Sequence, residues 1–162
     1  MKAASIKELK QAMANRTSGE LSDLCLRLAR FKKENKELLT YLLLELPDEA
    51  SYIESVKAEI SGEFEQINTS SYYYIKKSVR KILRATKKYI RYSQKKETEV
   101  ELLLHFCFLM KALRPSIFRN TVLRNLYDRQ LSGIRKVIST LHEDLQYDYQ
   151  MEVGRLRELD GG

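Results

Sequence analysis

VELLLHFCFLMKAL, residues Val100 to Leu113, is the most apolar stretch of the chain. A helix that is apolar on all sides is one that its neighbours must cover. A membrane span needs about 20 consecutive apolar residues, whereas this run is shorter, contains Glu101 and His105, and is flanked by lysines. We therefore expect the central core helix of a soluble fold here, with its large side chains in the core: Leu102, Leu103, Leu104, Phe106, Cys107, Phe108, Leu109 and Met110.

Length and composition indicate one helical domain. At 162 residues the chain is the size of an ordinary domain and can bury a core without disulfides or metal. Only 6 glycines and 2 prolines, beside abundant Leu, Glu, Lys and Arg, favour helices over a turn-rich β protein. The expected helices show no fixed repeat, which argues against a helical solenoid. We predict a single all-α domain over 1–162, an irregular antiparallel bundle of about five to seven helices.

The N-terminal third contains two helix-start signals. Apolar residues in helical phase predict a short helix over 6–14 and further helix over 19–46, which Pro47 ends. The polar run 32–36 has no Gly or Pro, so 19–46 is either one long helix or two. Both starts have the Ser/Thr-x-x-Glu spacing of a capping box: Ser5 with Glu8, and Thr17 with Glu20.

The next two predicted helices carry opposite charges. The exposed side of the helix over 48–67 has six carboxylates against Lys57 alone, whereas residues 71–96 contain ten Lys or Arg and no acid. Steps of about 100° per residue place the Ile and Val of the second helix on one side and its cations on the other. Six of these cations form the candidate phosphate or partner contact: Lys77, Lys81, Arg84, Lys88, Arg91 and Lys95.

Two interpretations of this basic face stay open. Aligned long cations suit a phosphate backbone because they displace condensed counterions together, and tyrosines at the edge can stack on unpaired bases. In that case the arginines of 114–135 should join the face in one exposed patch. Alternatively the face is solvated, or the acidic helix 48–67 or a subunit interface neutralises it, with Glu54, Glu59 and Glu63 as the nearest acids.

Apolar positions recur in helical phase after Pro115 for roughly 40 residues. A continuous helix of that length would measure about 60 Å, more than a compact bundle needs. We predict a long C-terminal helix over 116–158 that either kinks near Ser132 and Gly133 or projects over 137–158. Its first half is basic and its second half acidic. Either the helix self-associates through its opposite ends, or it packs along the bundle with its charges solvated.

The sequence has no catalytic, metal or cofactor pattern. It lacks a glycine-rich phosphate loop, a nucleophile elbow and a Cys/His constellation. His105 and Cys107 lie two residues apart on a helix, so their side chains point about 200° apart and cannot hold one ion. We expect Cys25 and Cys107 to be buried free thiols and His142 to lie at the surface. These features predict a protein that is not an enzyme and needs no cofactor.

Two functional classes follow. The first, which we favour, is a helical module that binds a protein partner or a second copy of itself, because chemistry is absent and the C-terminal helix is over-long and polarised. The second is sequence-non-specific binding of RNA or DNA through the basic helix 71–96. The N-terminal residues carry charges throughout and lack the apolar core of a secretory signal. We therefore expect a cytoplasmic protein without membrane insertion.

Overall fold

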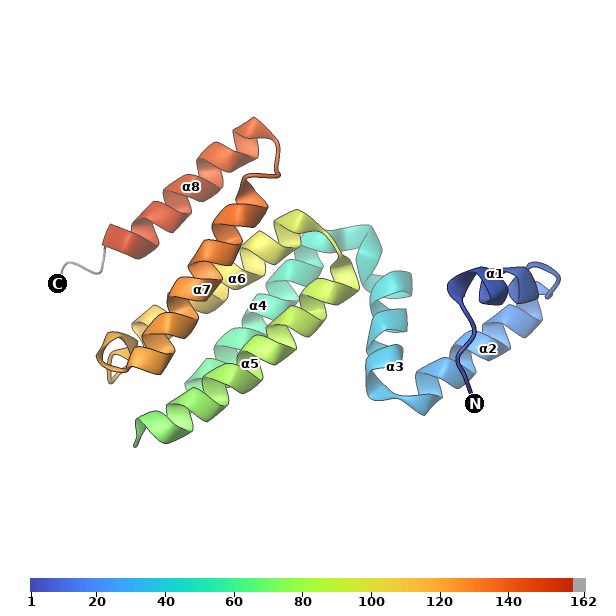
Figure 1. Ribbon diagram of the computed structural model, residues 1–162, viewed down its shortest axis with the longest axis horizontal. Helices are drawn as coiled ribbons and strands as arrows, with labels where there is room; N and C mark the ends of the chain where they lie inside the picture. The colour runs from blue at the N-terminus through green and yellow to red at the C-terminus, as the bar shows by residue number, and fades with distance from the viewer. Residues whose placement is uncertain (159–162) are drawn as a thin grey trace. The chain divides into compact units, whose positions relative to one another are not determined.

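The computed structural model describes residues 1–158, and the regular secondary structure of these residues is entirely helical (Figure 1). The prediction of an all-α helical bundle is confirmed. Short turns of other helix types lie at Tyr41–Glu45, which is π-helical, and at Leu46–Asp48 and Ile117–Arg119, which are 3-10 turns. The α-helices are α1 Ile6–Ala14, α2 Ser18–Phe31, α3 Lys33–Thr40, α4 Glu49–Glu65, α5 Tyr72–Ser93, α6 Lys96–Ala112, α7 Thr121–Ile138 and α8 Glu143–Glu158.

The chain divides into two compact units, Met1–Glu45 and Leu46–Gly162. The sequence analysis expected one domain over 1–162. We refer to the first as the N-terminal unit, which contains α1 to α3, and to the second as the main unit, which contains α4 to α8.

Helix α6 is the centre of the main unit, because α4, α5, α7 and α8 all pack against it. Val100, Leu102 and Phe106 have no exposed surface, so the prediction of a central core helix is confirmed. One residue is a correction: Phe108, which we expected in the core, is 57% exposed. It lines a surface pocket between α4 and α8.

A buried hydrogen-bond network joins the start of α4 to the turn between α5 and α6. Glu49 accepts hydrogen bonds from the hydroxyl of Thr98, at 2.6 Å, and from the hydroxyl of Ser93. Thr98 has no exposed surface, and Ser93 is 7% exposed. The turn itself is tight because Gln94 adopts a left-handed conformation with φ 58°, which ends α5 and reverses the chain into α6.

The long C-terminal helix expected over 116–158 is two helices, α7 and α8. The chain breaks after Ile138, because the hydroxyls of Ser139 and Thr140 bond the carbonyls of Lys136 (2.6 Å) and Val137 (2.7 Å) and so compete with helix continuation. It does not kink at Gly133, and residues 143–158 do not project: α8 folds back along α7 and packs against α6 and α7 (Figure 1).

The N-terminal unit has the predicted helix starts but almost no core. Both capping boxes form, Ser5 with Glu8 and Thr17 with Glu20. The segment 19–46 breaks at Lys32, which is extended (φ −147°, ψ 139°), and the side-chain amide of Asn35 donates to the carbonyl of Leu28 across the break at 2.8 Å. Every residue of α1, α2 and α3 keeps some solvent exposure, and only Tyr41 is buried among the described residues of this unit.

Candidate functional site

Helix α5 carries the candidate cations on the face opposite its buried residues. Lys77, Lys81, Arg84 and Arg91 are exposed, and within residues 1–158 none of them forms an ion pair. Lys88 is half-buried, with its Nζ atom 5.0 Å from the centre of the Tyr89 ring, a distance at which a cation and an aromatic face attract each other. Five of the six predicted residues therefore share one helix face.

Lys95 is separated from the other five. It lies beyond the end of α5, and its Nζ atom is 3.2 Å from Oε2 of Glu49. It belongs to the network that closes the turn between α5 and α6 and is already paired there.

The other carboxylates of α4 that were expected to face the cations, Glu54, Glu59 and Glu63, have other contacts or none within residues 1–158. Among the described residues, Glu54 pairs with Lys57 of its own helix at 3.4 Å, and Glu59 accepts a hydrogen bond from the Tyr89 hydroxyl at 2.7 Å. Glu63 is exposed and makes no ion pair with the described part of the chain. Within residues 1–158, none of these three carboxylates thus forms an ion pair with a cation of 71–96.

The arginines of 114–135 join the basic face only in part. A groove of about 440 Å³, which we call the α5–α7 groove, has Lys87 of α5 and Arg129 of α7 in its lining. Arg135 instead lines a separate hollow between α7 and α8, together with Arg157. The remaining lining residues of the α5–α7 groove are Leu83, Glu99, Leu103, Leu126, Gln130 and Gly133.

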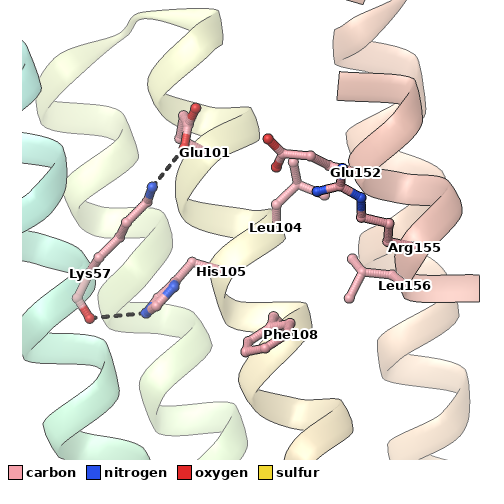
Figure 2. A pocket seen from close by; sticks show the side chains of 8 residues that line it. All are labelled: Lys57, Glu101, Leu104, His105, Phe108, Glu152, Arg155 and Leu156. Atoms are coloured by element: carbon pink, nitrogen blue, oxygen red, sulfur yellow. Dashed lines mark hydrogen bonds and ion pairs between the residues drawn. The ribbon is translucent and has the colours of Figure 1, made fainter. Parts of the chain in front are cut away.

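A second hollow, of about 270 Å³, lies between α4, α6 and α8 (Figure 2). It gathers five titratable side chains from three helices, and it was not predicted from the sequence. Its apolar lining residues are Leu104, Phe108 and Leu156. Its titratable lining residues are Lys57, Glu101, His105, Glu152 and Arg155.

Glu101 connects the helices around this pocket, because each of its carboxylate oxygens accepts a hydrogen bond from another helix. The Lys57 ammonium of α4 donates to Oε2 at 2.7 Å, and the Tyr149 hydroxyl of α8 donates to Oε1 at 3.0 Å. Burial alone would lower the pKa of Lys57, but the hydrogen bond and charge of Glu101 raise it above its usual value. The cluster thus braces α4, α6 and α8 against one another.

His105 is not placed to activate the adjacent serine. Its Nε2 atom lies 2.8 Å from the hydroxyl of Ser61. The same atom lies 3.1 Å from the carbonyl oxygen of Lys57 (Figure 2). A carbonyl only accepts, so Nε2 must carry the proton and donate, and it cannot remove a proton from Ser61. Within residues 1–158 no group bonds Nδ1, so the third member of a catalytic triad is missing as well.

The electrostatics of the pocket also fit a structural role. Burial, followed by the charge of Lys57, lowers the pKa of His105 and so favours the neutral imidazole. Burial, followed by the charge of Glu101, raises the pKa of Glu152, and the same two causes raise the pKa of Tyr149. All three pKa shifts come from burial first and then from the charge of Lys57 or Glu101, and these two residues are already hydrogen-bonded to each other.

A third hollow lies within the N-terminal unit and is lined mainly by apolar side chains and by the stems of basic ones. It measures about 590 Å³ and runs between α2 and α3. Leu43 and Leu44, in the π-helical turn, are 66% and 74% exposed. We call this the α2–α3 groove; it is lined by Leu26, Ala29, Arg30, Lys33, Lys36, Leu39, Thr40, Leu43 and Leu44.

The cysteines differ from each other. Cys107 is buried, as expected, and burial raises the pKa of its thiol to about 12. Cys25 is exposed, so the expectation that it would be buried is wrong; the apolar stripe of α2 on which it lies has no cover. His142 is exposed, as expected.

The described residues contain neither a metal-binding cluster nor a membrane-spanning helix. Within 1–158, no three His, Cys, Asp or Glu side chains come together in a way that would hold a metal ion. None of the helices in this part of the chain combines the length and the apolar character that a bilayer crossing requires.

The pocket residues that the sequence analysis missed had weak signals. Lys57 is the single cation of an acidic helix, and His105 is a polar residue inside the most apolar helix. Both patterns mark polar groups that need a partner. Their partners lie more than 40 residues away, as in the Lys57–Glu101 bond, which spans 44 positions.

Comparisons with protein-family models, with curated proteins and with solved structures found no match to this chain.

Proposed function

We propose that the chain is a non-enzymatic protein-interaction module, and that its N-terminal unit docks an amphipathic helix of another protein. The observation that supports this is the α2–α3 groove, in which Leu43 and Leu44 are mostly exposed. Apolar side chains that gather in a groove, with polar groups at its rim, are typical of a binding surface. Scattered single leucines would not be.

The charges of the groove favour an acidic partner. Arg30, Lys33 and Lys36 stand among its apolar residues, and the whole unit 1–45 has nine Lys or Arg against six Asp or Glu. A helix with apolar residues at i, i+3 or i+4, and i+7 fits such a groove, and carboxylates beside that stripe would face the three cations. We therefore propose that an acidic amphipathic helix occupies the α2–α3 groove.

The other hollows support binding rather than catalysis. The polar groups of the α4–α6–α8 pocket bond one another, and Nε2 of His105 is held as a donor. A cytoplasmic setting is part of the proposal, because Cys25 and Cys107 are both free thiols, as is usual in a reducing compartment.

The test uses two designed helical peptides of about 20 residues with the same leucine stripe, one flanked by Glu and one by Lys. Binding of each labelled peptide to the full chain is measured by fluorescence anisotropy. We expect the Glu peptide to bind more tightly, and Leu43→Gln with Leu44→Gln to weaken its binding about tenfold. Leu28→Gln, at a 59% exposed leucine outside the groove, is the matched control.

Charge reversal tests the rim. Lys36→Glu should weaken binding of the Glu peptide and strengthen binding of the Lys peptide, whereas Lys32→Glu, outside the groove, should do neither. Equal effects of the groove and control variants would contradict the proposal.

Either of two further results would overturn the proposed docking of a partner helix. If Leu43→Gln with Leu44→Gln lowers the melting temperature of the isolated chain, these leucines already pack within the folded protein. If sedimentation velocity shows a dimer that the same variants dissociate, the occupant is a second copy of the chain.

A further inference from the structure

We infer that α5 and the α5–α7 groove form a binding site for a single-stranded nucleic acid, with phosphates along the outer face of α5 and bases at an exposed tyrosine and in the groove. This site is independent of the proposed docking function, since none of its residues belongs to the N-terminal unit. Four features of the structure carry the inference.

The first feature is a continuous line of cations. Residues spaced alternately by four and three positions lie above one another on a helix, and one such line on α5 begins at an aromatic residue and continues with basic ones. From Lys77 to Arg91 it extends over about 21 Å. We call this the basic stripe; it consists of Tyr73, Lys77, Arg80, Arg84, Lys87 and Arg91.

The second feature is that the charge of the stripe is not compensated. Lys77, Arg84 and Arg91 form no ion pair within residues 1–158, and the carboxylates of α4 have other partners or none among these residues. A row of exposed cations without counter-charges gains most from binding a polyanion, because several condensed counterions are released together.

The third feature is that the stripe leads into the α5–α7 groove. Lys87 belongs to both, and Arg129 of α7 also lines the groove. Three leucines, Leu83, Leu103 and Leu126, form the apolar part of its lining. Gly133 adds no side chain there, and a Cβ atom at this position would meet open space. Such a hollow accommodates the flat face of an unpaired base.

The groove also contains one carboxylate, Glu99, which is half-buried and makes no ion pair within residues 1–158. A carboxylate repels a phosphate but accepts hydrogen bonds from the amino groups of bases. Its position on α6, in the lining of the groove and not on the outer face of α5, fits bases in the groove and phosphates outside it.

The fourth feature is the aromatic end of the stripe. Tyr73 is 67% exposed, and its ring meets that of Tyr74 edge to face, with 5.4 Å between ring centres. The preceding residue anchors this end, because the Tyr72 hydroxyl donates to the carbonyl of Ser116 at 2.8 Å. An exposed ring on a fixed backbone is a platform for base stacking.

These features favour a single strand over other anionic partners. A membrane surface would require large aliphatic or Trp anchors beside the cations, and the exposed large apolar residues of α5 are the two tyrosines. A duplex buries its bases and would use neither Tyr73 nor the groove.

The first experiment measures binding of fluorescein-labelled oligo(dC) and oligo(rC), of about 20 nucleotides, to the full chain over a range of salt concentrations. We expect a log–log salt slope of several units. Lys77→Glu with Arg84→Glu should weaken binding at least about tenfold and reduce the slope by about 2. Arg124→Glu with Arg135→Glu makes the same charge change on α7 away from the stripe and should have little effect. No binding, or equal losses in the two double variants, would overturn the site.

The second experiment separates base contacts from charge. Tyr73→Ala should weaken binding of oligo(dC) about tenfold and leave heparin binding unchanged, while Tyr147→Ala, at a 66% exposed tyrosine of α8, is the control. If single strand, duplex and heparin bind alike and Tyr73→Ala has no effect, the face is a general anion surface. If phosphatidylserine vesicles bind and oligonucleotides do not, the partner is a membrane. Either result would overturn the inference.

Discussion

The two units of this chain are built from similar helices but differ in whether their apolar faces are covered. In the main unit, α6 is surrounded by four helices, and residues such as Val100 and Phe106 have no exposed surface. In the N-terminal unit, α1 and α2 have complete capping boxes, yet Phe31 remains 84% exposed. A capped amphipathic helix is thus necessary for a core but does not by itself create one.

We expect protein binding at the unit whose apolar surface is uncovered. The main unit satisfies its buried polar groups internally, as Glu101 does with Lys57 and Tyr149. The N-terminal unit leaves apolar area that a partner can cover. The following four predictions test the contrast, beginning with the largest effect.

Removal of a central core side chain should distinguish the units most clearly. The ring of Phe106 packs edge to face on Phe64, with 5.5 Å between ring centres. Phe106→Ala should lower the free energy of unfolding by about 3–5 kcal/mol, measured by urea denaturation with far-UV circular dichroism. Phe31→Ala in the N-terminal unit should change it by less than about 0.5 kcal/mol. Similar losses would mean that Phe31 is also packed.

The buried network at the start of α4 should give the next largest effect. Glu49→Ala removes the acceptor of the Thr98 and Ser93 hydroxyls, and an unsatisfied buried group costs about 1–3 kcal/mol. Glu49→Gln, which keeps an acceptor oxygen, should recover part of this loss. Glu63→Ala, at an exposed position of the same helix, is the control and should be nearly neutral in the same urea titration.

Helix caps should have different consequences in the two units. Asn120 caps α7 by accepting from the backbone N–H of Leu123 at 3.1 Å, and Asn120→Ala should cost about 1 kcal/mol of main-unit stability. Thr17 caps α2 by accepting from the backbone N–H of Glu20 at 3.2 Å. Thr17→Ala should nevertheless only speed amide hydrogen exchange in the N-terminal unit. A loss of main-unit stability in Thr17→Ala would show that the units unfold together.

The smallest effect should come from His105. Its pKa is lowered by burial and by Lys57, so the unfolded chain binds the proton more tightly than the folded chain. The stability contribution is therefore complete above the ordinary value of 6.5 and is lost as the pH falls from 6.5 towards the lowered pKa. The groups that face the imidazole are Lys57 and Glu54 of α4, Glu101 of α6, and Glu152 and Arg155 of α8.

His105→Gln should flatten this dependence, as measured by the melting temperature at pH 7.5 and pH 5.5. His142→Gln, at an exposed histidine, should leave the dependence as in the original chain. An unchanged pH dependence in His105→Gln would assign the effect to other groups.

Local features of the sequence predicted the fold class and most of the helices. Capping boxes and apolar stripes involve residues within a turn or two of each other, so Ser5 with Glu8 predicted the start of α1 correctly. The core helix α6 could be recognised because a segment apolar on all sides has to be buried.

The breaks and the pocket could not be predicted in this way. Neither Lys32 nor Ser139 is a glycine or proline, and hydrogen bonds of Asn35 and of the Ser139 hydroxyl end those helices. The bonds of Glu101 join three helices that are distant in sequence. Only the folded chain brings such residues together, which is also why the joining of Lys87 and Arg129 in one groove could not be foreseen.

The two cysteines give the chain a chemical reporter for each unit. A thiol reacts with an alkylating reagent as its thiolate, and only when the reagent can reach it. Cys25 is exposed, whereas Cys107 is enclosed and its pKa is raised to about 12. Iodoacetamide should therefore modify the native chain once and quickly, at Cys25. The appearance of a second adduct in the mass spectrum would then time the opening of the core around α6.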